Sequence, residues 1–366
     1  MSKKSIWVYG IILVLVAGAS VGLWQQNTLA AWYRTWKLQS ASADSLSGYV
    51  RTFEALGVTG TESLIGCFQS KNETACQNAG HVLSKILKIW PINDSRRTLV
   101  IQQLADQAPS YSSFGQREAL TILLELMQGD SATPEMQKAF ASVIANSHAN
   151  AECRLQVYAV LMQALQNVEN IDETLYKQAK SLVIVGTKSD QEAVRVATIR
   201  LAVLPGLQLH EHLAPLLASQ HVDPSHEVRQ LALLALGEHE KLLATDDLCK
   251  FLNDSDREVR SIAERALQVR GLSLGQIKLA RLMHDENAVH RAELAGLVMN
   301  TSEVDCLQWM ERLIRDPSPA VRASAARAMG SSADQRMTTL LRTLTEQEQD
   351  QTVHQIARYY LRSEAK

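Results

Sequence analysis

The chain has 366 residues, a formal net charge of -2, 46% hydrophobic residues and only 5% aromatic residues. This length exceeds what one hydrophobic core usually serves, so we expect two domains or a repeat array. Because little aromatic or β-branched material is left over for strands, the composition predicts an all-α protein. The balanced charge, with no dense basic run, excludes nucleic acid as the expected partner.

The N-terminus carries a membrane signal. After a short basic segment, residues 1–5, residues 6–24 are mostly apolar, and no charged residue occurs between Ser5 and Tyr33. As a helix, residues 6–24 would extend about 28 Å, which matches the hydrocarbon core of a bilayer. We therefore predict a transmembrane signal-anchor helix over residues 6–24.

A cleaved signal peptide is the alternative interpretation of the same segment, because residues 17–19 are small enough for a cleavage site. Both interpretations give one orientation. Lys3 and Lys4 adjoin the segment directly, whereas Arg34 and Lys37 lie well beyond it. The positive-inside tendency then predicts a cytoplasmic N-terminus with the bulk of the chain extracytoplasmic, which in a Gram-negative bacterium is the periplasm.

Residues 25–44 are predicted to form a juxtamembrane amphipathic helix and a polar linker. Leu29, Trp32, Tyr33 and Trp36 recur at i, i+3, i+4 and i+7, so they would share one helix face. That face could lie among lipid headgroups, or it could belong to an ordinary helix that packs on the following domain. The spacing alone leaves both interpretations open.

Residues 45–114 contain amphipathic segments with no common period, which predicts an irregular helical N-terminal cap. Within it, "CFQSKNETAC" places Cys67 and Cys76 on either side of a polar turn. A disulfide between Cys67 and Cys76 is a candidate in an oxidising compartment. The five cysteines form no CxxC pattern, so no structural zinc site is expected.

From residue 115 to residue 362 the sequence becomes repetitive. In its most regular part, an aspartate and an arginine six residues later recur every 31 residues: Asp223, Asp254, Asp285 and Asp316 with Arg229, Arg260, Arg291 and Arg322. Pro follows Asp223 and Asp316, so we expect the aspartates to be helix N-caps with Pro at the first helical position. Two antiparallel helices per unit, stacked on their neighbours, would bury a continuous core.

This column pattern, D-x-x-x-x-V-R-x-x-A-x-x-x-L/M-G, resembles the short HEAT repeats also called PBS-lyase HEAT-like repeats. The resemblance implies a right-handed α-solenoid of helical hairpins over residues 115–362. It also implies that the Asp and Arg columns form a ladder between repeats rather than a catalytic set. The unit at Asp285 departs most from the pattern, since His290 replaces the recurring valine. We expect a local change in packing or a partner contact there.

An enzyme remains the alternative function. His-Glu pairs occur at His210, Glu211 and His212, at His226 and Glu227, and at His239 and Glu240. Deoxyhypusine hydroxylase, a HEAT-like enzyme, holds iron with such pairs, but there they recur at one place in the repeat, and here they do not. A lyase activity would rest on the repeat type alone, which is a fold analogy. No known catalytic motif is present, and no cofactor or metal is expected.

The sequence therefore predicts a membrane-tethered HEAT-repeat scaffold that is not an enzyme. Extended solenoid surfaces bind proteins more often than they perform chemistry. We expect unidentified protein partners, contact with the membrane through the N-terminal helix, and no nucleic acid. The sequence predicts neither the identity of the partner nor the oligomeric state.

Overall fold

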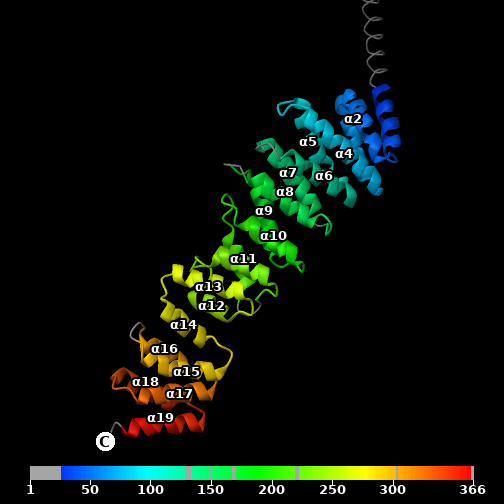
Figure 1. Ribbon diagram of the computed structural model, residues 1–366. Helices are drawn as coiled ribbons and strands as arrows, with labels where there is room; N and C mark the ends of the chain where they lie inside the picture. The colour runs from blue at the N-terminus through cyan, green and yellow to red at the C-terminus, as the bar shows by residue number, and fades with distance from the viewer. Residues whose placement is uncertain are drawn as a thin grey trace, which may run out of the picture. The chain divides into compact units, whose positions relative to one another are not determined.

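A computed structural model describes residues 26–127, 133–148, 150–166, 170–218, 222–301 and 304–363. These residues form helices, turns and loops, with no strand among them (Figure 1). The all-α prediction is therefore confirmed for this part of the chain. The predicted transmembrane segment, residues 6–24, lies outside the described residues. Among the residues that are described, no helix is both long enough and apolar enough to cross a bilayer.

The chain divides into two compact units between His212 and Leu213. This division falls inside the solenoid predicted for residues 115–362, between Arg195 and Arg229, which are 34 residues apart, whereas the later arginines recur every 31. The first unit begins with a helix over residues 26–38. Its further helices are η1 (Ala43–Ser45), α2 (Leu46–Ala55), α3 (Gly57–Gly66), η2 (Cys67–Gln69), α4 (Glu73–Ile89), α5 (Ser95–Gln107), η3 (Ala108–Ser110), α6 (Ser113–Leu126), α7 (Pro134–Ser147), α8 (Arg154–Leu165), α9 (Glu173–Gly186) and α10 (Glu192–Ala202).

The helices of the first unit stack in two layers. One layer runs through α2, α4, α6, α8 and α10, each packed on the next, and the other runs through α3, α5, α7 and α9. Residues 45–114 belong to this stack, because α4 packs on α6 and α5 packs on α7. The region predicted to be an irregular cap therefore continues the helical stack, although its sequence lacks the Arg column seen further along.

The helix starts of the first unit follow ordinary capping chemistry. The side chains of Asn72, Asp94, Ser112, Thr133 and Asp172 each accept a hydrogen bond from a backbone N–H of the first turn. Such caps satisfy donors that have no partner within the helix. Local sequence therefore fixes where these helices begin, and burial of their apolar faces fixes how they stack.

The second unit contains η4 (His210–Leu217) at the division, α11 (His226–Leu236), α12 (Thr245–Lys250), η5 (Phe251–Asn253), α13 (Arg257–Val269), α14 (Leu274–Met283), α15 (Ala288–Met299), α16 (Cys306–Leu313), α17 (Pro319–Gly330), α18 (Gln335–Gln347) and α19 (Gln351–Ser363). In one layer α11 packs on α13, α15 packs on α17 and α17 packs on α19; in the other, α12 packs on α14 and α16 packs on α18. Helical hairpins stacked in two layers form an α-solenoid. Its right-handed sense stays a prediction.

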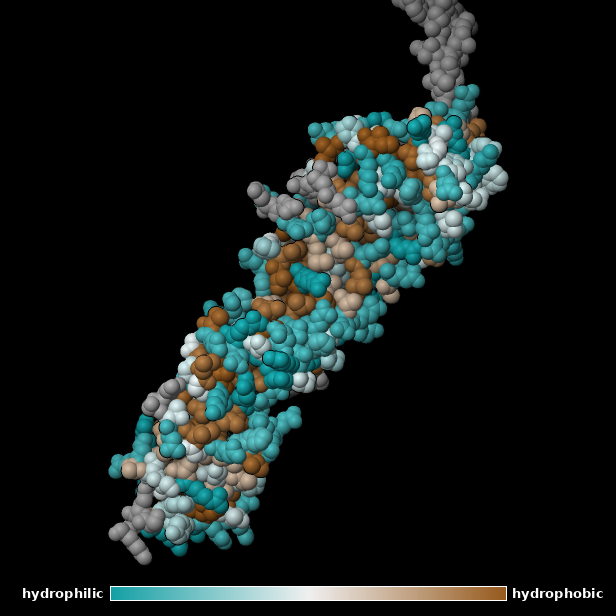
Figure 2. All heavy atoms as spheres, in the orientation of Figure 1, coloured by the Kyte–Doolittle hydropathy of each residue, from teal (hydrophilic) through white to brown (hydrophobic). Residues whose placement is uncertain are grey.

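The core of the second unit has a boundary between α13 and α15. Buried residues from α15 to α19, together with Leu279 of α14, form one apolar cluster that includes Leu294, Leu313 and Met329. No buried side chain of α13 belongs to this cluster. On the face shown in Figure 2, apolar groups form small patches separated by hydrophilic ones. The apolar cluster of the C-terminal helices therefore ends between α13 and α15, within the region where the sequence repeats most regularly.

Candidate protein-interaction surface

The recurring arginines lie at equivalent positions in the first turn of α11, α13, α15 and α17: Arg229, Arg260, Arg291 and Arg322. Each one donates from Nη1 to two backbone carbonyl oxygens of the loop before its own helix. For Arg260 these acceptors are Asp254, at 2.7 Å, and Ser255, at 2.9 Å. This shared anchor leaves the Nε and Nη2 groups of each guanidinium available for the next repeat.

Three of the four arginines use this free edge to bind a carboxylate in the following repeat. The forked pairs join Arg229 to Asp254 at 2.8 and 2.7 Å, Arg291 to Asp316 at 2.8 and 3.0 Å, and Arg322 to Glu348 at 2.7 and 2.9 Å. Bidentate pairs of this kind are strong and geometrically specific. We call each such pair a rung. The carboxylates beside them raise the pKa values of Arg291 and Arg322.

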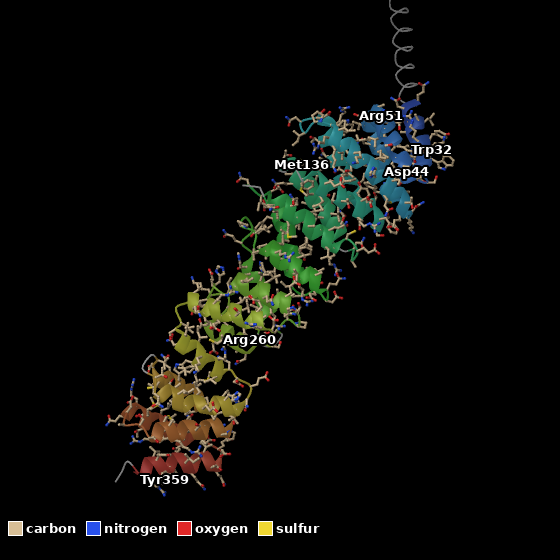
Figure 3. All side chains as sticks on the ribbon, in the orientation of Figure 1. Trp32, Asp44, Arg51, Met136, Arg260 and Tyr359 are labelled. Atoms are coloured by element: carbon tan, nitrogen blue, oxygen red, sulfur yellow. The ribbon has the colours of Figure 1, made fainter. Side chains whose placement is uncertain are left out.

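The rung between Arg260 and Asp285 is open. Among the described residues, no carboxylate forms an ion pair with Arg260, and Asp285 Oδ2 instead lies 2.9 Å from Nδ1 of His290. Hydrogen bonds from the backbone N–H of Asn287 and from His290 hold the pKa of Asp285 below its usual value. Arg260, labelled in Figure 3, belongs to α13. Three rungs are therefore closed and one, in the middle of the series, is not.

Glu348 closes the last rung, and the sequence pattern did not identify it. It lies 26 residues after Arg322, whereas Asp254 and Asp316 lie 25 residues after their arginines. The partner is also a glutamate rather than an aspartate. A search for any acid 25 or 26 residues after each arginine would have found it.

The aspartates are not the helix N-caps that the sequence predicted. The N-caps of α11, α13, α15 and α17 are Ser225, Asp256, Asn287 and Ser318, each two residues after its aspartate. The aspartates accept a hydrogen bond from the backbone N–H of these N-cap residues, as from Ser318 to Asp316 at 2.8 Å. Each aspartate therefore stabilises the loop before its helix through one carboxylate oxygen. An aspartate that belongs to a rung also accepts hydrogen bonds from an arginine of the preceding repeat.

A hollow of about 190 Å³ lies on the other layer of the second unit, lined by residues of α12, α14 and α16. Arg312 of α16 reaches Asp246 of α12 at 2.6 Å, and Nε2 of His284, just after α14, lies 3.4 Å from the same aspartate. Trp309 lines the wall beside them. This contact joins α12 to α16 across the position of α14, on the opposite layer from the open rung.

Burial decides the electrostatics of this hollow. It lowers the pKa of His284 against the opposing effect of Asp246, so the imidazole favours its neutral form. Burial also opposes ionisation of Asp246, but Arg312, together with His284 and Lys250, outweighs it and holds the pKa of Asp246 below its usual value. Burial raises the pKa of the nearby Cys249 thiol to about 11, which leaves it unreactive at neutral pH.

The structure does not assemble the His-Glu pairs into a metal site. Within the described part of the chain, no group of three or more His, Cys, Asp or Glu side chains is placed to hold a metal ion. Nε2 of His212 lies 3.3 Å from its neighbour Glu211, and no further ligand joins them. The arrangement around His226 and His239 likewise offers no ligand set.

Cys67 and Cys76 lie close together at the turn between η2 and α4, but both are free thiols in this structure. Cys76 Sγ donates to the carbonyl oxygens of Cys67 and Ser70, both at 3.4 Å. Burial raises the pKa of Cys67 to about 12 and also raises that of Cys76. A disulfide between them stays a prediction, which thiol counting under denaturing conditions, with and without a reductant, would test.

The predicted stripe near the N-terminus is exposed. Leu29, Trp32, Tyr33 and Trp36 are 66%, 67%, 48% and 60% exposed, while Ala31 and Leu38 of the same helix are fully buried. Trp32 is labelled in Figure 3 at the N-terminal end of the first unit. The helix nevertheless packs on the following domain through its other face, since Arg34 donates to the carbonyl oxygen of Thr52 at 3.1 Å and Asn78 donates to that of Leu38 at 2.9 Å. The interpretation as an ordinary packed helix is therefore supported, and contact of the exposed stripe with lipid headgroups stays a prediction. Four large, mostly apolar side chains on one face of this helix are therefore exposed, and exposed apolar patches often mark a contact with a protein or a membrane.

Stacked hairpins joined by Arg–carboxylate rungs define a helical repeat protein. A comparison with known families matches residues 278–362 to HEAT repeats. This part of the chain begins in α14 and ends in α19, so it includes two of the closed rungs. The resemblance stated from the sequence is thus supported over the C-terminal repeats, and HEAT repeats commonly mediate contacts between proteins.

No curated protein matches the chain. Among solved structures, the crystal structure of an engineered protein is similar at 16% sequence identity and a TM-score of 0.36. The similarity covers 93% of this chain and 95% of that one.

Proposed function

We propose that this chain is a membrane-tethered HEAT-repeat scaffold that binds protein partners through its solenoid surface on the extracytoplasmic side. The match to HEAT repeats and the stacked hairpins support the interaction role. The observation that carries the tethering is the exposed stripe of Leu29, Trp32, Tyr33 and Trp36. Aromatic and aliphatic side chains on one helix face suit the boundary between headgroups and acyl chains, directly after a segment predicted to span the bilayer.

Extraction of membranes from cells that express the full-length chain tests the tether. We expect the chain to stay with the membrane at alkaline pH and to be released only by detergent. A reporter that is active only outside the cytoplasm, fused after Lys366, should be active. Release without detergent would contradict the tether, and a silent reporter together with an active cytoplasmic one would contradict the orientation.

Crosslinking in intact membranes tests the interaction role. A cell-permeable crosslinker should trap the full-length chain with at least one other protein, and the same product should form at native expression level. If only products of the chain with itself form, the scaffold role is wrong and self-assembly replaces it.

The enzymatic alternative has no supporting observation among the described residues. Metal analysis of the purified chain tests the enzymatic alternative. Stoichiometric iron or zinc that is lost in His226→Ala and His239→Ala variants would contradict the scaffold proposal.

A further inference from the structure

The junction between α13 and α15 differs from the other junctions of its layer in the side chains that would meet there. Gly237 and Gly330 allow close approach, since a Cβ on Gly237 would lie 2.9 Å from Cβ of Ala266 and one on Gly330 would overlap the ring of Tyr360. The equivalent residue of α13, 31 positions after Gly237, is Gln268, and it is exposed. The equivalent residue of α15 is Met299, which packs against the apolar cluster of α15 to α19. Among the four helices, α13 therefore carries the polar side chain in this column.

A second position shows the same change. Leu233 of α11, Ala295 of α15 and Ala326 of α17 are all buried. Their equivalent on α13 is Glu264, which pairs with Arg281 of α14 at 2.9 Å. Packing α15 against α13 would bury this ion pair, and burial of an ion pair costs desolvation energy that a leucine or an alanine does not.

The opposing face of α15 is uncovered. Ile262 and Ala266 of α13 are 5% and 8% exposed, because they pack toward α11. The equivalent residues of α15 are Glu293, which is exposed, and Leu297, which is 41% exposed. A Cβ built on the neighbouring Gly296 would meet nothing within 4 Å. This face lacks the helix that the repeat pattern would place beside it.

The chain's own carboxylate is turned away from the junction. Asp285 accepts from the backbone N–H of Asn287 and contacts His290, at the position where Val259 and Val321 are fully buried. Arg260 keeps both carbonyl anchors of the closed rungs, so its Nε and Nη2 groups are already held in position. A preformed fork for a carboxylate on α13 and an uncovered face on α15 therefore belong to the two sides of one junction, and α14 packs on both helices.

We propose that the junction between α13 and α15 is a docking site for an acidic helix start of a partner protein. A carboxylate of the partner would accept from Nε and Nη2 of Arg260, as Asp316 does from Arg291. Its apolar side chains would cover Leu297. The proposal rests on the scaffold function and adds the place and the chemistry of the contact. Charge complementarity favours an acidic helix start as the occupant, because Arg229, Arg291 and Arg322 each bind a carboxylate that directly precedes a helix.

A peptide of residues 316–331 is a suitable probe, because this segment already supplies the carboxylate that binds Arg291. Labelled with a fluorophore, it would be titrated with the full-length chain in detergent or nanodiscs, and the anisotropy recorded. We expect saturable binding. Arg260→Gln in the chain, or Asp316→Asn in the peptide, should each weaken it about tenfold or more, since each removes a charge-assisted fork. The two changes together should weaken it no further than either alone.

Arg265→Gln provides the matched control. Arg265 lies on the same helix as Arg260, carries the same charge, and has a side chain that is 62% exposed and forms an ion pair with Glu258 of its own helix. This variant should bind the peptide as the wild type does, within about twofold. The far-ultraviolet circular dichroism spectra of both variants should match that of the wild type, which separates loss of binding from loss of structure.

Three outcomes would overturn the proposal. The peptide could fail to bind, or it could bind the Arg260→Gln variant as tightly as the wild type. Self-association of the full-length chain that Arg260→Gln abolishes would assign the junction to a second copy instead of a partner protein. Failure of the scaffold function would look different, because crosslinking in membranes would then trap no other protein, whatever residue occupies position 260.

Discussion

Arg291 and Arg260 have the same anchors and different partners. Both donate from Nη1 to two carbonyl oxygens of the preceding loop, but only Arg291 also binds a carboxylate of the next repeat. Both belong to the same 31-residue series, and each is followed 25 residues later by an aspartate. The Asp and Arg signature therefore specifies that a rung can form. The residues that set how closely two helices approach decide whether it does.

The two junctions also differ in the side chains that lie between their helices. Where α15 meets α17, small residues such as Ala295 and Ala326 are fully buried, and Ser324 donates to the carbonyl oxygen of Ala292 at 2.7 Å. At the open junction, Glu264 occupies the column of Ala295 and Ala326, and Gln268 occupies the column of Met299 and Gly330. On the other layer, the pair between Asp246 and Arg312 joins α12 to α16. On that layer an ion pair thus spans the junction, whereas on the layer of α13 and α15 no rung does.

Breaking a closed rung should have the largest effect on stability. Arg291→Ala leaves Asp316, whose side chain is 6% exposed, without its cation. We expect a loss of about 3 kcal/mol in the free energy of unfolding, because a buried charge left without its partner is costly. Urea unfolding of the full-length chain, followed by circular dichroism, measures this loss. An effect below about 1 kcal/mol would mean that the closed rungs do not stabilise the stack.

Closing the open rung by mutation should have the next largest effect. The triple variant Glu264→Ala, Gln268→Met and His290→Val gives α13 the side chains that α15 carries at Ala295 and Met299, and restores the recurring valine in α15. We expect a gain of about 1 to 2 kcal/mol in the free energy of unfolding as α15 packs on α13. The same variant should lose the binding of the 316–331 peptide. Retained binding with unchanged stability would show that these columns do not hold the junction open.

Arg260→Ala should have a smaller effect than Arg291→Ala. It removes only the two hydrogen bonds to the carbonyl oxygens of Asp254 and Ser255, so we expect a loss of about 1 kcal/mol. The comparison uses the same urea experiment and the same chain length as for Arg291. A loss equal to that of Arg291→Ala would indicate that Arg260 has a carboxylate partner in solution.

Acidification should produce the smallest effect, through His284 in the hollow on the other layer. Burial lowers the pKa of His284 in the folded chain, so below about pH 6.5 the unfolded chain takes up a proton more readily than the folded one. Stability should therefore fall as the pH drops from about 6.5 toward 5.5, before carboxylates titrate. His284→Gln should flatten this part of the profile in thermal melts. An unchanged slope would show that the histidine stays accessible to protons in the folded state.

Much of the fold could be predicted from the sequence because it depends on local and periodic signals. Apolar spacing and the 31-residue interval predict stacked hairpins, and the Arg column predicts the start of α11, α13, α15 and α17. The N-caps were misplaced by two residues because Asp-Pro suits a helix start in isolation. In the stack, the carboxylates that close rungs also receive an arginine from another repeat, 25 residues away in sequence.

The open rung could not be predicted in full. His290 stood out because it breaks the valine column, and the structure places it on Asp285 beside the interruption. Glu264 and Gln268 attract no attention in the sequence, since exposed polar residues are common on helices. Their importance depends on which helix faces them. The exposed state of Trp32 and Trp36 likewise depends on the fold, because their spacing fits a buried face equally well.

Two double-mutant cycles test the central claim most directly. One combines Arg260→Ala with Asp285→Ala, and the other combines Arg291→Ala with Asp316→Ala, each in the full-length chain and each read as the free energy of unfolding in urea. We predict a coupling energy of about 2 kcal/mol between Arg291 and Asp316, and a coupling near zero between Arg260 and Asp285. Equal couplings in the two cycles would show that the junction between α13 and α15 is closed, and would contradict the account.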